Sequence, residues 1–332
     1  MLRYLVRRIL WAVLLFVVVT LIAFVLFFLI PANPAQLACG KACTQQDVQR
    51  VAHALGTDRP VYTQYGWFLG RLMPVSFKGG PHLKKPNLGR SFVNRRDVDS
   101  VVAEAAPVTA SLVFGAMILW MLIALPVGIL SALRPRSLLD RASMTGVLIG
   151  ISLHPVFIGL MLSFLIGYEA HLTPIAGYAN FFGGLYGAPG GPIQWAYHLI
   201  LPWITLAILN AAIYVRMIRA NVMETMNEDF VRTARAKGAP EFRVMRAHIL
   251  RNALLPIVTM LGMDVAAALG GAIFTETVFG LNGLGYNAIQ AIGNYDSPTV
   301  MGIIVFATTA IIVMNLIVDL LYAWIDPRIR LV

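Results

Sequence analysis

Long uncharged hydrophobic runs dominate the chain and predict its architecture. The first run extends from Ile9 to Ile30, and five further runs of the same kind follow. A helix needs roughly 20 apolar residues to cross a hydrocarbon core about 30 Å thick, so each run predicts one crossing. We therefore expect an all-α integral membrane protein with six spans. The expected spans cover residues 9–30, 105–133, 142–168, 199–215, 253–275 and 297–325, with the fourth starting earlier, near Trp195.

Basic residues in the loops predict the orientation of these spans. With six spans, both termini and the 134–141 and 216–252 loops share one side, which carries 16 of the 26 Lys and Arg residues. The other 10 all lie between Lys41 and Arg96, in one long external loop. Long loops cross a membrane largely regardless of their charge, so the short loops decide. They place both termini in the cytoplasm.

Composition narrows the function. Hydrophobic residues make up 58% of the chain and charged residues 13%, which excludes a soluble domain. The net charge of +10 follows mainly from the asymmetry of the loops. It indicates contact with the headgroups of the lipid bilayer and with a protein partner, and we expect no nucleic acid as a partner.

The sequence contains no recognisable catalytic constellation. Neither a Gly-x4-Gly-Lys-Ser/Thr phosphate-binding loop nor a His-Glu-x2-His pattern occurs. We therefore expect no catalytic residue, no metal site and no cofactor in this chain. His154 precedes Pro155 inside the third run and is expected to be hydrogen-bonded within the bundle, with a catalytic role as the alternative.

The external segment 32–102 is expected to be an accessory region with two amphipathic helices. Thr44 and Asp47 resemble the start of the first helix, and Pro60 can open the second. Residues 74–85 are rich in Gly, Pro and Lys and predict a loop. The second helix is expected to present one apolar face made of Tyr62, Tyr65, Leu69 and Leu72. The expected division of the chain is 1–31 for the N-terminus and first span, 32–102, and 103–332 for a five-span core.

Two cysteines lie close together in this external segment. Cys39 and Cys43 fall within the sequence ACGKAC. A disulfide between them is plausible in an oxidising compartment, although its stabilising effect would be modest because the loop it closes is short. Metal binding by the pair and two free thiols are the alternatives.

The basic 216–252 loop is expected to fold outside the membrane. Asn227 is predicted to cap a first short helix and Gly238 to end it. Pro240 is predicted to start a second helix toward Arg251. Two short helices joined by a turn of small residues would make a compact peg, which is typical of a docking surface for a cytoplasmic partner.

Three acidic residues fall inside or at the end of predicted spans, where an ionisable group is costly and normally faces a cavity or a partner. Asp264, near the middle of the fifth span, either lines a translocation path or makes an interhelical hydrogen bond. Glu276, at the outer end of that span, is assigned either to the path, as an external gate or docking contact, or to plain surface exposure. Asp319 is expected to be structural.

Several motifs, taken in this order and topology, resemble the permease subunits of bacterial ATP-binding-cassette importers in the oligopeptide, dipeptide and nickel branch. They include MLRYLVRRIL at the start, LLDR after the second span, DFVRTARAKG and LRNALLP in the basic loop, and ETVFGLNGLG after the fifth span. The resemblance covers nearly the whole chain. It implies the type I importer permease fold and a location in the bacterial inner membrane.

The resemblance also implies a role for the basic loop, whose helix pair would insert into a groove on an ATPase subunit. The family's motif begins Glu-Ala-Ala; Arg232, Thr233 and Ala234 stand at those positions here, and Gly238 is retained. Small residues such as Ala234 and Gly238 would allow close backbone approach. The implied ATPase-coupling residues are Arg232, Thr233, Ala234, Arg235, Lys237, Gly238, Pro240 and Glu241.

The same resemblance implies partners and a reaction. The partners are a second homologous permease subunit, two ATP-binding subunits that hold Mg-ATP, and an external solute-binding protein or lipoprotein. The implied function is ATP-driven import of peptides by alternating access. Asp264 stands where a neutral polar residue is usual, and this leaves nickel, glutathione or another small solute as alternatives. An ion-coupled secondary transporter that uses Asp264, Glu276 and Asp319 is the alternative from another class.

Overall fold

The computed structural model is largely helical. The predicted Cys39–Cys43 disulfide and most of the first external helix lie outside the residues it describes, and the division of the chain at residues 31 and 102 stays a prediction. The described residues are 2–29, 44–46, 48–49, 53, 60–72, 75–76, 82–83, 87–183 and 190–325.

Helices follow one another along most of the described chain, and the exceptions include a two-stranded antiparallel hairpin inside the predicted loop 74–85. In chain order the elements are α1 (Leu2–Phe24), η1 (Val25–Leu29), α4 (Val61–Leu72), β1 (Val75–Ser76), β2 (His82–Leu83), α5 (Val98–Leu133), α6 (Leu138–Ser152), α7 (Pro155–Leu162), η2 (Ser163–Glu169), α8 (Pro192–Met226), α9 (Asp229–Ala236), α10 (Glu241–Arg243), η4 (Val244–Ile249), α11 (Leu250–Ala253), α12 (Leu255–Leu269), α13 (Ile273–Val278), α14 (Leu284–Gly293) and α15 (Ser297–Ile325).

Four described helices are each long and apolar enough to cross a membrane: α1, α5, α8 and α15. Two further pairs pass the same test together but are bent at a break. The α6 helix meets the α7–η2 segment at 101°, and the Glu241–Ala253 segment meets α12 at 45°. The expected early start of the fourth span is confirmed, since α8 begins at Pro192. The chain is thus a largely helical, multi-pass membrane protein.

The third predicted span is not one straight helix, because α6 ends at Ser152 and α7 begins at Pro155. Proline lacks a backbone N–H and disfavours the helical conformation in the residue before it. His154 is accordingly extended, with φ −75° and ψ 140°. Its Nδ1 accepts a hydrogen bond from the Val156 backbone N–H (3.3 Å), and its side chain is exposed. The prediction that His154 lies within the bundle is wrong; it caps a helix.

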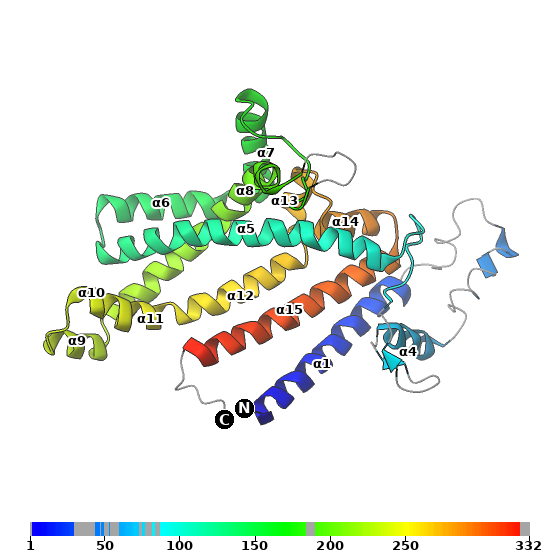
Figure 1. Cartoon of the computed structure of the whole chain (residues 1–332), viewed down its shortest axis with the longest axis horizontal. Helices are drawn as coiled ribbons and strands as arrows, with labels where there is room; N and C mark the ends of the chain where they lie inside the picture. Colours follow the sequence, from blue (N-terminus) through cyan, green and yellow to red (C-terminus); the bar gives the residue numbers. More distant parts are fainter. Residues whose placement is uncertain are drawn as a thin grey trace.

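The fifth predicted span is also interrupted, at a glycine turn between α12 and α13. Gly271 has a φ of +132°, which favours glycine. A methyl group on Gly271 would also come within 2.6 Å of the Gly285 Cα, so the two backbones touch. The chain therefore leaves the direction of α12 here and packs back against the bundle as α13 and α14 (Figure 1).

The long helices pack through small residues. The α5 and α8 helices make the most extensive contact among the described elements. Gly115 on α5 admits the ring of Trp203, whose Nε1 donates to the Ser111 carbonyl (3.0 Å). The α12 helix packs on α15 in the same way, at Gly262 against Val318. Close packing at small residues holds helices together in lipid, where the hydrophobic effect between them is weak.

The second external helix forms as predicted, and of its four predicted face residues Tyr65, Leu69 and Leu72 are half-buried. Tyr62 is exposed, whereas Tyr65 and Phe68 of α4 pack against Phe24 near the end of α1. The Tyr65 hydroxyl also donates to the Val17 carbonyl (2.9 Å). The α4 helix is therefore fastened to α1.

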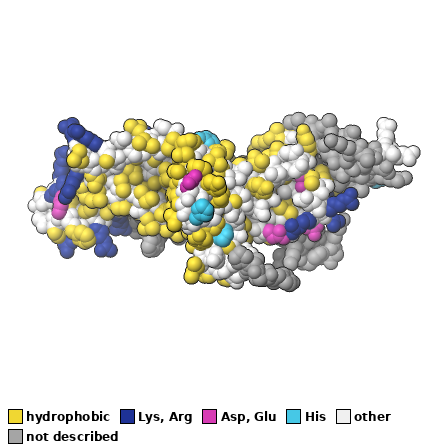
Figure 2. All heavy atoms as spheres, turned by 90° about the horizontal axis from the view of Figure 1, so that it is seen from above, with side chains coloured by type: hydrophobic (Ala, Val, Ile, Leu, Met, Phe, Trp, Pro, Cys, Tyr) yellow, Lys and Arg dark blue, Asp and Glu magenta, His cyan; other side chains and the backbone are white. Residues whose placement is uncertain are grey.

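The two ends of the molecule differ. In Figure 1 the α5–α6 turn and the helices α9 and α10 lie at one end, which we call the basic end. The α4, α13 and α14 helices lie toward the other end, the opposite end. Lys and Arg side chains gather at the basic end and hydrophobic side chains cover the surface between the two (Figure 2). Exposed leucines such as Leu122 and Leu148 belong to this apolar surface, which is typical of contact with lipid.

Candidate functional site: the basic peg between α8 and α12

The basic loop folds into two helical segments, α9 and the stretch from α10 to α11, and we call residues 228–253 the peg. The link between α8 and α9 consists of Asn227 and Glu228 alone. The prediction that Asn227 caps α9 is wrong. Asn227 ends α8, its Nδ2 donates to the Met223 carbonyl (2.9 Å), and Glu228 stands at the N-cap position of α9.

The turn between the two helical segments follows the prediction. The α9 helix ends at Ala236, and Gly238 adopts a φ of +78°, a conformation that glycine accepts without strain. Pro240 then stands at the N-cap position of α10. Arg235 on α9 holds Glu241 on α10 through Nε (3.0 Å) and Nη2 (2.6 Å). This two-point ion pair closes the turn, so Arg235 already has an acidic partner within its own chain.

A small apolar core makes the peg a folded unit rather than a merely solvated loop. Val231 of α9 and Val244 and Ile249 of η4 are fully buried. They belong to the same hydrophobic cluster as Val222 near the end of α8, and this cluster continues between α5 and α8. The peg is therefore packed onto α8 in addition to being linked to it in sequence.

The outward face of the peg combines positive charge with exposed aromatic rings. Phe242 is 75% exposed and Phe230 is 41% exposed, while Arg232 and Lys237 are also exposed. Aromatic and arginine side chains are enriched at protein interfaces, so this face fits a protein partner that carries acidic groups.

The other predicted coupling residues differ in whether they are exposed or packed within the peg. Ala234 is half-buried and packs against the peg's own core, so it does not offer a free surface for close approach. Gly238 is exposed, and a methyl group there would meet open space. The Thr233 hydroxyl donates to the backbone carbonyl of Asp229, one turn earlier on the same helix α9 (2.9 Å). Of the two small residues, Gly238 alone faces outward.

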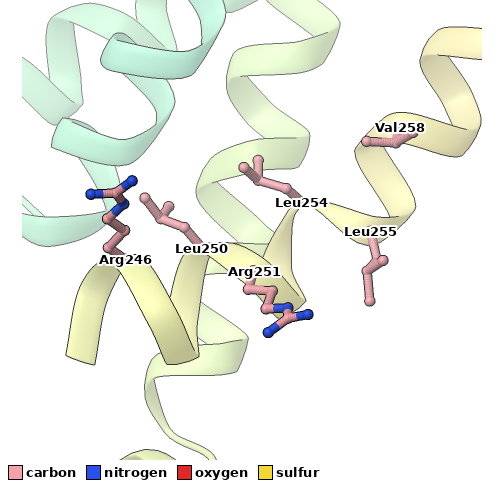
Figure 3. A pocket seen from close by; sticks show the side chains of 6 residues that line it. All are labelled: Arg246, Leu250, Arg251, Leu254, Leu255 and Val258. Atoms are coloured by element: carbon pink, nitrogen blue, oxygen red, sulfur yellow. The ribbon is translucent and has the colours of Figure 1, made fainter. Parts of the chain in front are cut away.

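A groove marks the place where the peg joins the bundle. It has a volume of about 370 Å³ and lies at the 45° bend between α11 and α12. Figure 3 shows that Arg246 and Arg251 lie on the peg side of the groove, whereas Leu255 and Val258 lie on α12 beyond the bend. Its lining residues are Arg246, Leu250, Arg251, Leu254, Leu255 and Val258.

The two predicted path residues have different surroundings. Asp264 is half-buried on α12, and its Oδ2 accepts a hydrogen bond from the hydroxyl of Tyr214 on α8 (2.7 Å). Asp264 thus makes an interhelical hydrogen bond, which was one of its two predicted roles. The side chain of Asp319 lies outside the described part of the chain.

Glu276 is fully buried, so the predictions of surface exposure and of an external docking contact are both wrong. Its carboxylate accepts from the Thr109 hydroxyl on α5 (2.7 Å) and from the Tyr286 backbone N–H on α14 (2.8 Å). Gly283 lies directly against this carboxylate, where a methyl group would collide with it. Burial raises the pKa of Glu276 above the ordinary glutamate value. The residue, itself on α13, joins this helix to α5 and α14.

The opposite end carries a polar pocket of about 750 Å³. Asn94, Asn180 and Asn282 line it together with the ion pair between Arg96 and Glu104. Amides and charges of both signs suit a polar or zwitterionic solute, or the surface of a protein that delivers one. The sequence did not single out these asparagines because they come from three separate segments.

The sequence analysis also missed two buried carboxylates. Asp140 at the basic end is bound by Arg219 of α8. Asp296 at the opposite end accepts from the Ser91 hydroxyl (2.5 Å) and the Phe92 backbone N–H (2.9 Å). Asp140 lies in the motif LLDR, yet nothing local in the sequence shows that this residue or Asp296 is buried.

Two family models together match almost the whole chain. The model described as "Binding-protein-dependent transport system inner membrane component" matches residues 124–331. The model for the N-terminal part of the same kind of membrane component matches residues 1–113.

Full-length relatives are similar to the chain along its entire length. A dipeptide transport system permease protein, DppB, of Escherichia coli is 34% identical over 348 aligned positions, which cover 99% of each chain. A di/tripeptide transport system permease protein of Pseudomonas aeruginosa is 35% identical over 344 positions, with 99% of each chain covered. A putative peptide transport system permease protein of Brucella abortus is 32% identical, with 98% of each chain covered.

Proposed function

Because the chain belongs to the family of binding-protein-dependent transport system inner membrane components, we propose that it is the membrane-spanning subunit of an ATP-driven peptide importer. The observation that carries this proposal is the similarity to dipeptide and di/tripeptide permeases over 99% of both chains. A peptide presents charged termini and variable side chains. The chain would therefore supply a weakly selective path, and the binding protein would select the solute.

The proposed topology has six spans and two cytoplasmic termini. It counts each bent helix pair as one crossing, and in the second pair α12 lies in the membrane while Glu241–Ala253 lies outside it as part of the peg. The N-terminal end of α1 and the C-terminal end of α15 then lie on the same side as the α5–α6 turn and the peg, which carry the basic residues of the short loops (Figure 1). The basic end is cytoplasmic in this proposal, and the polar pocket of the opposite end faces the compartment from which peptide is delivered.

The proposed partners follow from the parts that the sequence of this chain lacks. It has no phosphate-binding loop, so ATP with its Mg²⁺ would be bound by two ATPase subunits. A second, homologous permease subunit would complete the path, and an external solute-binding protein would deliver the peptide. The outward face of the peg, with Phe242, Phe230, Arg232 and Lys237, would dock into the ATPase.

The alternative of an ion-coupled transporter finds little support in the geometry. It needs acidic groups that can release and bind protons along a path. Glu276 is fully buried within the subunit, and Asp264 is hydrogen-bonded to Tyr214. Nickel and glutathione are also not the solutes named for the relatives described above, which are named for peptides.

Uptake by the whole complex in liposomes tests the proposal. Labelled dipeptide should accumulate only with ATP and the binding protein, and an uncoupler should not reduce it. Unlabelled tripeptide should compete with the label, whereas nickel and glutathione should not. Uptake that follows a proton gradient without ATP would overturn the proposal. His154→Ala serves as a control, since an exposed helix cap with no chemical role should leave uptake intact.

A further inference from the structure

A buried ion pair ties the α5–α6 turn to α8 at the basic end. Asp140, in the first turn of α6, is only 4% exposed. Its two carboxylate oxygens are held by Arg219 of α8, through Nε to Oδ1 (2.7 Å) and through Nη2 to Oδ2 (3.0 Å). Two-point pairing of this kind fixes orientation as well as distance. The pair therefore resists both sliding and rotation of α6 against α8.

The same carboxylate also organises the turn that joins α5 to α6. The Ser131 hydroxyl of α5 donates to Asp140, and so does the backbone N–H of Arg136 (2.8 Å). Arg136 has a φ of +64°, a strained conformation for a residue other than glycine. Such strain persists only where the surroundings enforce it, and here the carboxylate of Asp140 does so. Asp140 thus links three elements: α5, the turn and α8.

Tight packing at two glycines acts together with the ion pair to hold the three helices as one rigid body. A methyl group on Gly128 of α5 would lie 2.8 Å from the Ile218 side chain of α8. A methyl group on Gly150 of α6 would lie 2.9 Å from the Ala212 Cβ, also on α8. Both contacts leave no room for the helices to shift without separating.

The position of the pair connects this rigid body to the peg. Arg219 stands about two turns before the end of α8, and the peg begins directly after that end. The buried Val222 and Val231 pack the peg onto the same helix. A pull on the peg therefore reaches α8 first, and the Asp140–Arg219 pair directly links α8 to the α5–α6 turn.

We propose that Asp140 and Arg219 are positioning residues that make the α5–α6 hairpin follow α8 when the ATPase moves the peg. This inference rests on the proposed function and names the element that couples the peg to the rest of the bundle. Without the pair, the peg and α8 would still move with ATP, but the α5–α6 turn would no longer keep its fixed orientation to α8 during the movement. ATP would then be hydrolysed without moving solute.

The test uses the whole transporter in liposomes with Asp140→Asn, which keeps the size and the hydrogen-bonding oxygen but removes the charge. We expect ATP hydrolysis to continue while peptide uptake per ATP falls about tenfold or more, as expected when a rigid geometry is lost. Glu169→Gln is the matched control, because it neutralises an exposed acid at the end of η2, away from the α5–α6 turn and the peg. That control should leave peptide uptake per ATP unchanged.

A distance measurement separates coupling from simple destabilisation. Spin labels at the exposed positions Leu138 on α6 and Ala220 on α8 should keep one narrow distance with and without ATP in the otherwise unchanged protein. In Asp140→Asn the distance should change when ATP binds. Unchanged uptake per ATP together with an unchanged distance would overturn the proposal.

A second variant decides the matter if Asp140→Asn does not assemble. Arg219→Lys keeps the charge but cannot grip both oxygens in the same plane. Reduced uptake per ATP in this variant supports the proposal, and normal uptake per ATP overturns it. If the unchanged complex hydrolyses ATP but carries no peptide, the proposed substrate fails, and the ATP-dependent α6–α8 distance in the variants still tests the ion pair.

Discussion

The peg and the region around α14 use charge in contrasting ways. At the opposite end, Glu276 and Asp296 are buried. Glu276 accepts a hydrogen bond from the Tyr286 backbone N–H in the first turn of α14, and Asp296 accepts one from the Phe92 backbone N–H. In the peg, Glu241 is exposed and bonded to Arg235, while Arg232 and Lys237 face outward. The opposite end is thus held together by buried carboxylates, and the peg keeps its charges on a surface.

This difference separates stability from docking. Buried carboxylates that accept several hydrogen bonds hold a fixed geometry, and removing one leaves its donors unpaired. Exposed charges contribute little to stability but steer and select a partner. Substitutions at the opposite end should therefore change folding, whereas substitutions on the peg should change coupling. Four predictions test this division.

The largest effect is expected from Gly238→Trp on the peg. The positive φ of +78° strains any side chain there, and the indole would project from the turn into the space that a docked ATPase would occupy. We expect peptide uptake to fall by about tenfold or more, as for a misplaced geometry, while the subunit still assembles in the membrane. Uptake and ATP hydrolysis in liposomes measure the two quantities separately.

Gly293→Trp at the C-terminal end of α14 is the control for this change. Gly293 is likewise exposed and a methyl group there meets open space, but it lies at the opposite end. ATP hydrolysis should remain coupled in this variant. Equal loss of coupling in both variants would show that bulk alone, rather than the peg, explains the result.

The second effect is a loss of stability on replacing Glu276. Glu276→Leu leaves the Thr109 hydroxyl and the Tyr286 backbone N–H without their acceptor inside the protein. We expect a loss of about 3 kcal/mol in the free energy of unfolding, the cost of unsatisfied buried donors. Unfolding in detergent measures it, with the exposed Glu104→Gln as the control. A loss no larger than that of the control would contradict the assigned role.

The stability of the opposite end should also depend on pH through the same residue. Burial raises the pKa of Glu276 in the folded state above its value in the unfolded chain. Its contribution is then complete below the unfolded-state pKa and declines as the pH rises through the folded-state pKa. Glu276→Gln should remove this part of the pH dependence, which unfolding curves from about pH 4 to pH 8 can show.

The smallest effect is expected from Phe242→Ala on the peg. The ring is 75% exposed, so its loss should leave the unfolding temperature unchanged. If the ring docks into the ATPase, the affinity for that subunit should fall about tenfold, as for an interface anchor. Phe182→Ala is the matched control, because Phe182 is 96% exposed in the segment before α8, outside the peg. Unchanged affinity for Phe242→Ala would remove the ring from the docking surface.

Much of the helical architecture could be predicted because lipid imposes a simple requirement. Six long apolar runs, and the early start of α8, can be recognised from length and polarity alone. The breaks were harder to predict. Pro155 and Gly271 can each occur within a helix or end one, and the 101° bend and the reversal into α13 depend on what packs nearby.

The peg was largely predictable for a related reason. Gly238 and Pro240 act on their own backbone, so the turn follows from local chemistry. The N-cap residue of α9 could not be predicted, because Asn227 and Glu228 both precede the helix and the end of α8 decides which of them takes that position. The inward position of Ala234 likewise depends on Val231 and Val244 forming a core.

The amino-acid order by itself determined that this protein is an integral membrane protein. It also determined which loops are positively charged and at which point in the chain the basic peg interrupts the apolar runs. These properties depend on hydrophobicity and backbone preference, which act over a few neighbouring residues. Only the tertiary structure decided what the acidic residues do. Asp140 meets a residue 79 positions away and Glu276 one 167 positions away, so their burial and bonding depend on helix packing that brings distant segments together.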